Sequence, residues 1–286
     1  MTYNILSGAR PPSAFPKVQP SDLKFENRAP VLAEWIMAAR PDVLAVQENE
    51  PMRAPIRRPL RRLLPLLDGY RAVQPNSDIP ILYRASAFEV LDSGLRVISR
   101  KRHVRYGAWC RLRQRSSEQQ VVVANTHLDP HQSAAAFRAR EASLEVLTDW
   151  LRAVNVHRHL PTLLMGDFNT PFEFGSDGRI HGLGPLYDAG LRNSEEIAGH
   201  VTSAVPGASS LNSMGAVVNG SWRYGAVRRT GTRMDYIWVG PEFTVDTWQV
   251  VTGPGVRKVD GAPFFANGPV PSDHNPVLAE VSLPLT

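Results

Sequence analysis

Thr162-Leu163-Leu164-Met165-Gly166-Asp167-Phe168-Asn169 is a short apolar run that ends at a carboxylate and an amide. A run of this length is too short for a typical helix and is typical of a strand that is buried on both faces. A carboxylate in such a strand is costly to bury unless it contacts a partner or a metal. The stretch therefore predicts a core strand whose end carries a functional group.

Patterns of helix and strand alternate on both sides of this strand. The strongest helix pattern covers residues 134–154, and a shorter one covers residues 31–39 and ends before Pro41. Further buried strands are predicted at residues 2–6, 43–46, 121–128, 236–239 and 277–281. Stretches rich in Gly and Pro, residues 171–185 and 253–271, are expected to be loops. Because no repeat or linker interrupts the pattern, the simplest organisation is one domain over residues 1–286.

Composition excludes several classes of protein. Hydrophobic residues make up 43% of the chain and charged residues 21%, which is ordinary for a globular protein and unlike a disordered one. The single cysteine, Cys110, can build neither a disulfide framework nor a thiolate zinc site, and we expect it to be buried and inert. No apolar stretch is long enough to span a bilayer, and residues 1–7 lack an export signal. We expect a cytoplasmic protein by default, or a secreted one if an upstream signal segment is missing from this chain.

Net charge favours a polyanionic partner. The formal charge is +5 and the isoelectric point is about 9.6, which raises the encounter rate with phosphate-rich molecules. The excess of arginine over lysine fits phosphate recognition, but it equally fits a base-composition bias of the source genome. The densest basic run, residues 53–62, has the spacing of the solvated face of an amphipathic helix, and that interpretation is favoured over a dedicated nucleic-acid patch.

Polar side chains lie in or beside the apolar strands, several of them where a strand ends. They are Asn4, Glu48, His127, Asp167, Asn169, Asp235, Asp273 and His274. One such group would indicate only a satisfied hydrogen bond, whereas a whole set indicates a shared site. The oxygen-rich composition of the set favours a hard cation such as Mg²⁺ or Mn²⁺ over zinc or copper. Carboxylates, imidazoles and amides around such a cation suit phosphoryl transfer.

The sequence resembles the endonuclease/exonuclease/phosphatase superfamily of deoxyribonuclease-like, metal-dependent phosphoesterases. Motifs in the family's order carry the resemblance along almost the whole chain: Thr2-Tyr3-Asn4-Ile5-Leu6, Asp42-Val43-Leu44-Ala45-Val46-Gln47-Glu48, Asn125-Thr126-His127-Leu128, Gly166-Asp167-Phe168-Asn169, Met234-Asp235-Tyr236-Ile237 and Ser272-Asp273-His274-Asn275-Pro276-Val277. The resemblance implies an α/β fold, a four-layer sandwich of two mixed β-sheets packed face to face with helices outside. It also implies that residues 1–286 form a single catalytic domain.

A metal site of Mg²⁺, with Mn²⁺ as a possible substitute, follows from the same resemblance. Glu48 would be the principal metal ligand, and Asn4 and Asp273 would complete or orient its coordination shell. Gln47 would contact the metal ligands rather than the metal itself.

Catalytic roles follow from the resemblance as well. Asp167 would position or deprotonate the attacking water, and Asn169 would hold that water or a phosphate oxygen. His127 would donate to the phosphate near the leaving group. His274 would stabilise the transition state, and Asp235 would hydrogen-bond its imidazole and keep it cationic.

Other polar residues near the motifs are not assigned to the site. Asp129 and His131 are expected to cap the following helix or to face solvent. Arg105 occupies a position where relatives often carry an arginine, but a packing role is at least as well supported. His181, a histidine in the loop after Asn169, is expected to lie outside the site.

The motifs do not choose the substrate, since loops set specificity on this scaffold. The basic charge favours a nuclease that cleaves a phosphodiester of nucleic acid. A phosphoesterase of a lipid or small phosphorylated metabolite is the alternative. The aromatics of Phe172-Glu173-Phe174 and Pro263-Phe264-Phe265 are candidates for the exposed apolar patch that a lipid hydrolase needs, with ordinary loop packing as the default interpretation. A non-catalytic binding protein is disfavoured because no expected catalytic side chain is missing. We expect a monomer without stable membrane insertion, and the sequence indicates no protein partner.

Overall fold

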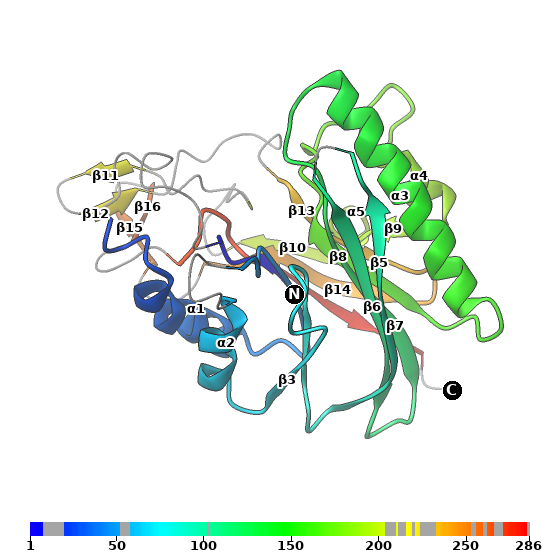
Figure 1. Cartoon of the computed structure of the whole chain (residues 1–286), viewed down its shortest axis with the longest axis horizontal. Coiled ribbons are helices and arrows are strands. Elements are labelled where there is room, and N and C mark those ends of the chain that lie inside the picture. The colour runs from blue at the N-terminus through cyan, green and yellow to red at the C-terminus, as the bar shows by residue number, and fades with distance from the viewer. Residues whose placement is uncertain are drawn as a thin grey trace.

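Two β-sheets packed face to face form the centre of the molecule, and helices lie on the outer side of each sheet (Figure 1). The structure is a computed structural model that describes residues 1–7, 20–51, 58–101, 103–203, 210, 216–218, 221–223, 233–252, 256–259, 262–265 and 271–284. Both sheets mix parallel and antiparallel pairs. The predicted four-layer α/β sandwich is therefore confirmed.

The first sheet contains the strand with which the chain begins. Its strands are β1 (Thr2–Asn4), β2 (Val43–Gln47), β3 (Tyr70–Val73), β4 (Ile81–Arg84), β10 (His200–Ser203), β14 (Thr244–Val250) and β17 (Val277–Ser282). They lie in the order β10-β14-β17-β1-β2-β4-β3. Parallel pairing places Asn4 level with Gln47, so the ends of β1 and β2 meet at one edge of the sheet.

The second sheet contains the strand that ends at Asp167. Its strands are β5 (Phe88–Ser99), β6 (Arg105–Gln114), β7 (Gln120–His127), β8 (Thr162–Asp167), β9 (Arg192–Asn193) and β13 (Asp235–Val239). They lie in the order β5-β6-β7-β8-β13-β9. The register places Asp167 beside His127 on one neighbouring strand and beside Asp235 on the other.

Three apolar clusters hold these layers together. The helices are α1 (Phe25–Ala39), α2 (Leu60–Leu63), the 3₁₀ turn η2 (Leu64–Leu66), α3 (Ala134–Asn155), α4 (Gly184–Asp188) and α5 (Ser194–Ile197). The α1 and α2 helices pack on the first sheet, and α3 and α4 pack on the second (Figure 1). Between the sheets lies a third cluster that includes Met165, Ile237 and the buried Cys110, whose thiol pKa is raised to about 12 by burial. The prediction of a buried, inert cysteine agrees with this environment.

Two sequence expectations about local structure need correction. The first helix begins at Phe25 and continues through Pro30, although the pattern predicted a start at Val31. Pro30 lies inside the helix, where it removes one i→i−4 hydrogen bond, so the packing of the buried Phe25, Ala29 and Leu32 must stabilise this turn. The stretch 253–271, expected to be a loop, contains the strands β15 (Val256–Val259) and β16 (Ala262–Phe265). With β11 (Ala216–Val218) and β12 (Ser221–Arg223), they form a small separate sheet.

The predicted amphipathic character of the basic run agrees with the structure in the residues that it describes. Arg61 and Arg62 in α2 are exposed while Leu60 and Leu63 are buried, which is the predicted amphipathic arrangement; residues 53–57 of the basic run lie outside the described residues. Among the described helices, none is long and apolar enough to cross a membrane.

Candidate active site

The polar side chains predicted from the motifs lie at one end of the sandwich, where strands of both sheets finish or begin. Asn4 ends β1, His127 ends β7, Asp167 ends β8 and Asp235 begins β13. Each of them is buried. Glu48, Asn169, Asp273 and His274 lie in the connections next to β2, β8 and β17.

Asn4 joins the two sheets. Its Nδ2 atom donates to Glu48 Oε1 at 3.2 Å and to Asp167 Oδ2 at 3.0 Å. Its Oδ1 atom accepts the backbone N–H of Leu6 at 3.1 Å, which fixes the orientation of the amide. The other oxygen of Glu48 accepts the backbone N–H of Ser7 at 2.6 Å. Asn4 therefore holds carboxylates from opposite sheets close together.

Three of the seven non-glycine residues with a positive φ angle in the described part of the chain lie next to these side chains. Leu6, Glu48 and Asn169 have φ angles of 53°, 62° and 50°, in the left-handed region that residues other than glycine rarely adopt. Each of these angles costs about 1–3 kcal/mol and persists only where the surrounding structure imposes it. All lie where a strand turns away from the polar cluster, which is typical of a functional site.

Asp167 is the centre of the cluster. Its Oδ2 atom lies 3.5 Å from His127 Nε2 and 3.7 Å from His274 Nε2, and its Oδ1 atom accepts the backbone N–H of Asn169 at 2.9 Å. Burial raises the pKa of Asp167, and the nearby charge of Asp235 raises it further, while the histidines oppose both effects. A cation bound nearby would therefore stabilise the charged form of Asp167.

The two histidines have opposite electrostatic environments. Burial lowers the pKa of His127, and the charge of Asp167 compensates only in part. Burial also acts to lower the pKa of His274, but the carboxylates of Asp235 and Asp167 outweigh it and hold that pKa well above its usual value. The Nδ1 atom of His274 lies 2.8 Å from Asp235 Oδ2. The site thus contains one imidazole that favours the neutral form and one that favours the cation.

Asp273 and Asn169 complete the set. Ser272 Oγ donates to the carbonyl of Asn4 at 2.6 Å and lies 3.5 Å from Asp273 Oδ1, so Asp273 is held beside β1. Asn169 donates its Nδ2 to the carbonyl of Leu128 at 3.0 Å, which leaves the amide oxygen to face other groups.

The donor set fits a divalent cation, although its tightest group differs from the predicted ligands. Among described residues, ligand atoms of Asp167, Asp235 and His274 lie within 4.8 Å of one another. The Oδ1 atom of Asp235 is buried without a hydrogen-bond partner in the described part of the chain, as expected for an atom that needs a further ligand. The predicted ligands Asn4 and Glu48 reach this group through the bond from Asn4 to Asp167. The whole arrangement can hold a cation between carboxylates of both sheets.

Sequence reasoning missed two residues that brace the site. Arg28 is fully buried and donates to the carbonyls of Ile5, Leu6 and Pro271 at 2.7–2.9 Å. Burial lowers its pKa to about 10, although the charges of Asp273 and Glu48 oppose this. The sequence signal that could have identified Arg28 is the presence of a charged residue on the apolar side of α1.

Ser210 is the second missed residue. Its hydroxyl accepts the backbone N–H of Met234 at 2.8 Å and of Asp235 at 3.2 Å, and its carbonyl accepts the backbone N–H of Asn275 at 2.5 Å. Ser210 therefore links the start of β13, which carries Asp235, to Asn275, the residue that follows His274. No local pattern marks it in the sequence.

Several residues left outside the site have clear positions. The Gln47 amide donates to Thr2 and Asn125 at 3.0 and 2.7 Å, so it joins the two sheets beneath the site. Ser133 caps α3, because its hydroxyl accepts the N–H of Ala136, so neither Asp129 nor His131 caps this helix. His131 faces solvent, which was the other expectation, whereas Asp129 is buried. Asp129 and His131 bind each other instead, at 2.6 Å.

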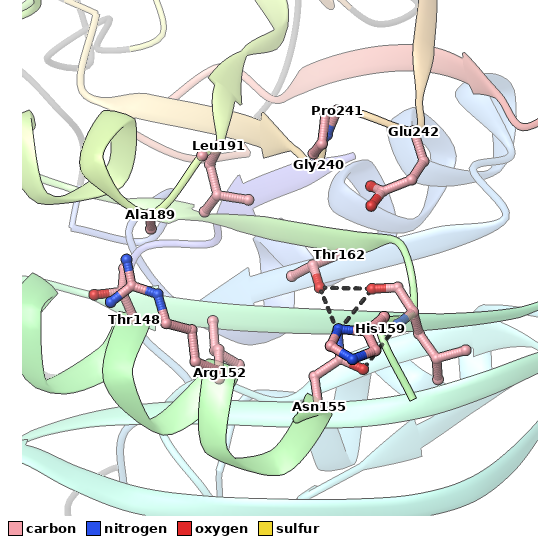
Figure 2. A pocket seen from close by; sticks show the side chains of 13 residues that line it. Thr148, Arg152, Asn155, His159, Thr162, Ala189, Leu191, Gly240, Pro241 and Glu242 are labelled. Carbon is pink, nitrogen blue, oxygen red and sulfur yellow. Dashed lines mark hydrogen bonds between the residues drawn. The ribbon is translucent and has the colours of Figure 1, made fainter. Parts of the chain in front are cut away.

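A cavity of about 290 Å³ lies away from this cluster (Figure 2). It is bordered by Thr162 and Gly240, at the opposite ends of β8 and β13 from Asp167 and Asp235, and by Arg152, Asn155 and His159 near the end of α3. It takes no part in the site described above.

Comparisons with known proteins agree with the fold and the motifs. A family model described as "Endonuclease/Exonuclease/phosphatase family" matches residues 1–274. Among curated proteins, none matches the sequence significantly.

Solved structures resemble the chain over nearly its whole length. An endonuclease/exonuclease/phosphatase family protein from Bacteroides thetaiotaomicron is 20% identical with a TM-score of 0.74, and the match covers 100% of this chain and 97% of that one. A mannosyl-6-phosphatase from the same organism is 19% identical with a TM-score of 0.72, covering 99% and 98%. TDP2 from D. rerio, complexed with a single-strand DNA product, is 17% identical with a TM-score of 0.64, covering 98% and 97%. At these identities the likeness concerns the fold.

Proposed function

Because the chain belongs to the Endonuclease/Exonuclease/phosphatase family, we propose that it hydrolyses a phosphoester bond with the help of a divalent cation, Mg²⁺ in the first place with Mn²⁺ as a substitute. Residues 1–286 would act as one catalytic domain and as a monomer. The preferred substrate in this proposal is a phosphodiester of nucleic acid.

The observation that carries the proposal is the convergence of buried acid, base and amide groups from both sheets. Asn4 of the first sheet bonds Asp167 of the second, and Asp167 lies within 3.7 Å of both His127 and His274. Buried charges of this kind cost several kcal/mol each unless something compensates them. A cation and an anionic substrate would supply that compensation together.

Each group then has a role that its environment supports. When bound, the cation supplies positive charge that polarises the phosphoryl oxygens. Glu48, Asn4 and Asp273 would hold it, with Asp167 close enough to share it.

Proton transfer would fall to the remaining groups. Asp167, whose pKa is raised by burial, is suited to accept a proton from the attacking water, which Asn169 would help to position. His127, whose pKa is lowered by burial, would donate a neutral hydrogen bond to the phosphate near the leaving group. His274, kept cationic by Asp235, would stabilise the negative charge that develops on the phosphoryl oxygens in the transition state.

Nucleic acid is favoured by the net charge of +5. A small phosphorylated sugar is the second candidate, since the mannosyl-6-phosphatase has the same fold over 98% of its length. The lipid alternative has less support from residues 172–174, because Phe172 is buried against Tyr236 and Phe174 is the exposed aromatic of that segment. The side chains of residues 263–265, the other candidate segment, lie outside the described part of the structure.

Cleavage of supercoiled plasmid by the purified protein in Mg²⁺ tests the proposal, with a panel of RNA, hexose phosphates and bis(4-nitrophenyl) phosphate beside it. We expect nicking that disappears with chelator and in His274→Ala. Turnover of hexose phosphates alone would move the proposal to the second candidate. No turnover of any phosphoester in Mg²⁺ or Mn²⁺ would overturn it.

A further inference from the structure

A pair of histidines lies at the surface next to the cluster, on the side of His127. The ring of His103, in the turn from β5 to β6, faces the ring of His131, in the connection from β7 to α3. The ring centroids are 6.4 Å apart and the planes differ by 15°. Both side chains are exposed, so a solute can reach them.

His131 is held rigidly from below. Asp129 Oδ1 accepts the backbone N–H of His131 at 2.9 Å and lies 2.6 Å from its Nδ1. Arg140, which is almost fully buried, donates to the carbonyls of both Asp129 and His131 at 2.9 and 2.6 Å. Because Nδ1 is used by the carboxylate, the Nε2 atom is the one that a ligand can engage. The loop is therefore built to present an imidazole donor.

Next to Asp129, which binds His131, the chain places the positive charge of Arg105. Its Nε atom is buried, and no hydrogen-bond partner for it occurs among the residues that the structure describes. Its charge acts on both His127 and Asp129, which lowers the pKa of each. The bond from the Thr126 hydroxyl to the Tyr106 carbonyl, 3.1 Å long, keeps the start of β6 against the end of β7. A phosphate bound beside Arg105 would place negative charge near a guanidinium whose Nε donor lacks a partner among the described residues, and that charge would be stabilised there.

The loop that carries His131 also contacts the catalytic cluster. Gln132 Nε2 donates to the carbonyl of Asn169 at 3.0 Å, so the loop that carries His131 lies against the end of β8. A group bound at His103, Arg105 and His131 would thus adjoin the position at which His127 meets the scissile phosphate.

We propose that His103, Arg105 and His131 form a binding site for a second, non-scissile phosphate group of the substrate. Phosphate oxygens accept several charge-assisted hydrogen bonds at once, and the two imidazoles lie beside Asp129, on which the charge of Arg105 also acts. The negative charge closest to them, Asp129, is already engaged by His131. The inference rests on the proposed function and narrows its substrate class to phosphoesters that carry another phosphate nearby, whether in a polynucleotide or in a small bisphosphate.

The test compares substrates that differ by one phosphate. The dinucleotides TpT, pTpT and TpTp share one scissile diester, and a hexose monophosphate and bisphosphate provide the same comparison for small molecules. We expect wild type to prefer the dinucleotide with the additional phosphate on one side by about tenfold in kcat/KM. In the double variant His103→Gln/His131→Gln and in Arg105→Ala, that ratio should fall towards one.

His157→Gln is the matched control, because His157 is an exposed histidine at the opposite end of α3 from His131. It should keep the wild-type ratio. A wild-type ratio of one in both substrate series, or a ratio that survives in the double variant, would overturn the inference. Preference in the hexose series alone would assign the second phosphate to a small bisphosphate.

A binding experiment separates this inference from the proposed function. Inorganic phosphate is titrated into the protein while the ring signals of the histidines are followed by NMR. We expect the signals of His103 and His131 to shift with one shared Kd, with a weaker Kd in Arg105→Ala and little shift of His157. If no phosphoester is hydrolysed but these shifts occur, the proposed function fails and the phosphate site stands. Equal shifts of all exposed histidines would reject the phosphate site.

Discussion

The bond between His274 and Asp235 determines which form of the imidazole is present. Asp235 contributes the largest favourable interaction that raises the pKa of His274, against the opposing effect of burial. Asp235→Asn removes that charge and places an amide at the 2.8 Å contact, so the pKa of His274 should fall. The cation would then be lost at lower pH, and the alkaline limb of the pH–rate profile should move to lower pH.

This change can be measured as kcat/KM against pH, with the rate at neutral pH expected to drop on the order of a thousandfold. Asp246→Asn, in an exposed position on β14, is a suitable control for loss of one carboxylate. An unchanged pH profile in Asp235→Asn would contradict the assignment of His274 as the cationic group.

Arg28 supports the site through the backbone alone. Its guanidinium donates to the carbonyls of Ile5, Leu6 and Pro271, which border Asn4 and Asp273. Arg28→Met keeps much of the side-chain volume but leaves those buried carbonyls without donors. We expect a loss of about 3 kcal/mol in the free energy of unfolding, measured with urea. Arg61→Met, at an exposed position of α2, should change that free energy by less than about 0.5 kcal/mol; equal effects of the two variants would refute the bracing role.

At the level of elements, Gly166 allows β7 and β8 to pair closely just before Asp167. A Cβ atom at this position would lie 2.2 Å from the carbonyl oxygen of Thr126, which belongs to the backbone and cannot rotate away. Gly166→Ala should push the end of β8 from β7 and displace Asp167 from His127. We expect both a lower melting temperature and a loss of activity of more than tenfold.

Gly184→Ala provides the comparison for this prediction, because a Cβ at Gly184 meets nothing within 4 Å. It should leave melting temperature and activity nearly unchanged. Near-normal activity of Gly166→Ala would mean that the strand end can relax without moving Asp167.

Elements with a strong apolar pattern were predicted well from the sequence. The strand Thr162–Asp167 has the bounds that its apolar run indicates, and α3 ends one residue beyond the predicted helix. The long strand β5 was not predicted, because it is half-exposed and carries alternating charges without a clear apolar face. The hairpin of β15 and β16 was hidden by glycine and proline nearby. Burial pattern, rather than intrinsic propensity, was the dependable signal.

The polar cluster could be assembled from sequence only in part. Asn4 and Asp167 are 163 residues apart, yet both were found because each interrupts the end of an apolar strand. Ser210 left no such mark, since its role depends on the hydrogen bonds of one hydroxyl in a connection between strands. His103 and His131 were also missed as a pair because their contact joins two loops.

For the whole molecule, the cluster of buried carboxylates should make stability depend on the cation. Asp167 and Asp235 raise each other's energy in the folded state, and this repulsion is relieved when the chain unfolds. A divalent cation that binds only the folded protein should stabilise it by about 2.7 kcal/mol at a hundred times its Kd. For a chain of this size, that corresponds to a rise of roughly 5–10 °C in melting temperature.

Differential scanning calorimetry in Mg²⁺, in Mn²⁺ and in chelator measures this rise. It should be lost in Glu48→Gln, which removes a charge that Asn4 and the Ser7 backbone hold in place. Glu242→Gln, at an exposed position beside the distant cavity, should keep the wild-type response. A rise of equal size in all three proteins would mean that the cation binds elsewhere on the surface. If no protein shows a rise, the charges of the buried carboxylates are already compensated by the protein's own histidines, and the prediction of a stabilising cation is wrong.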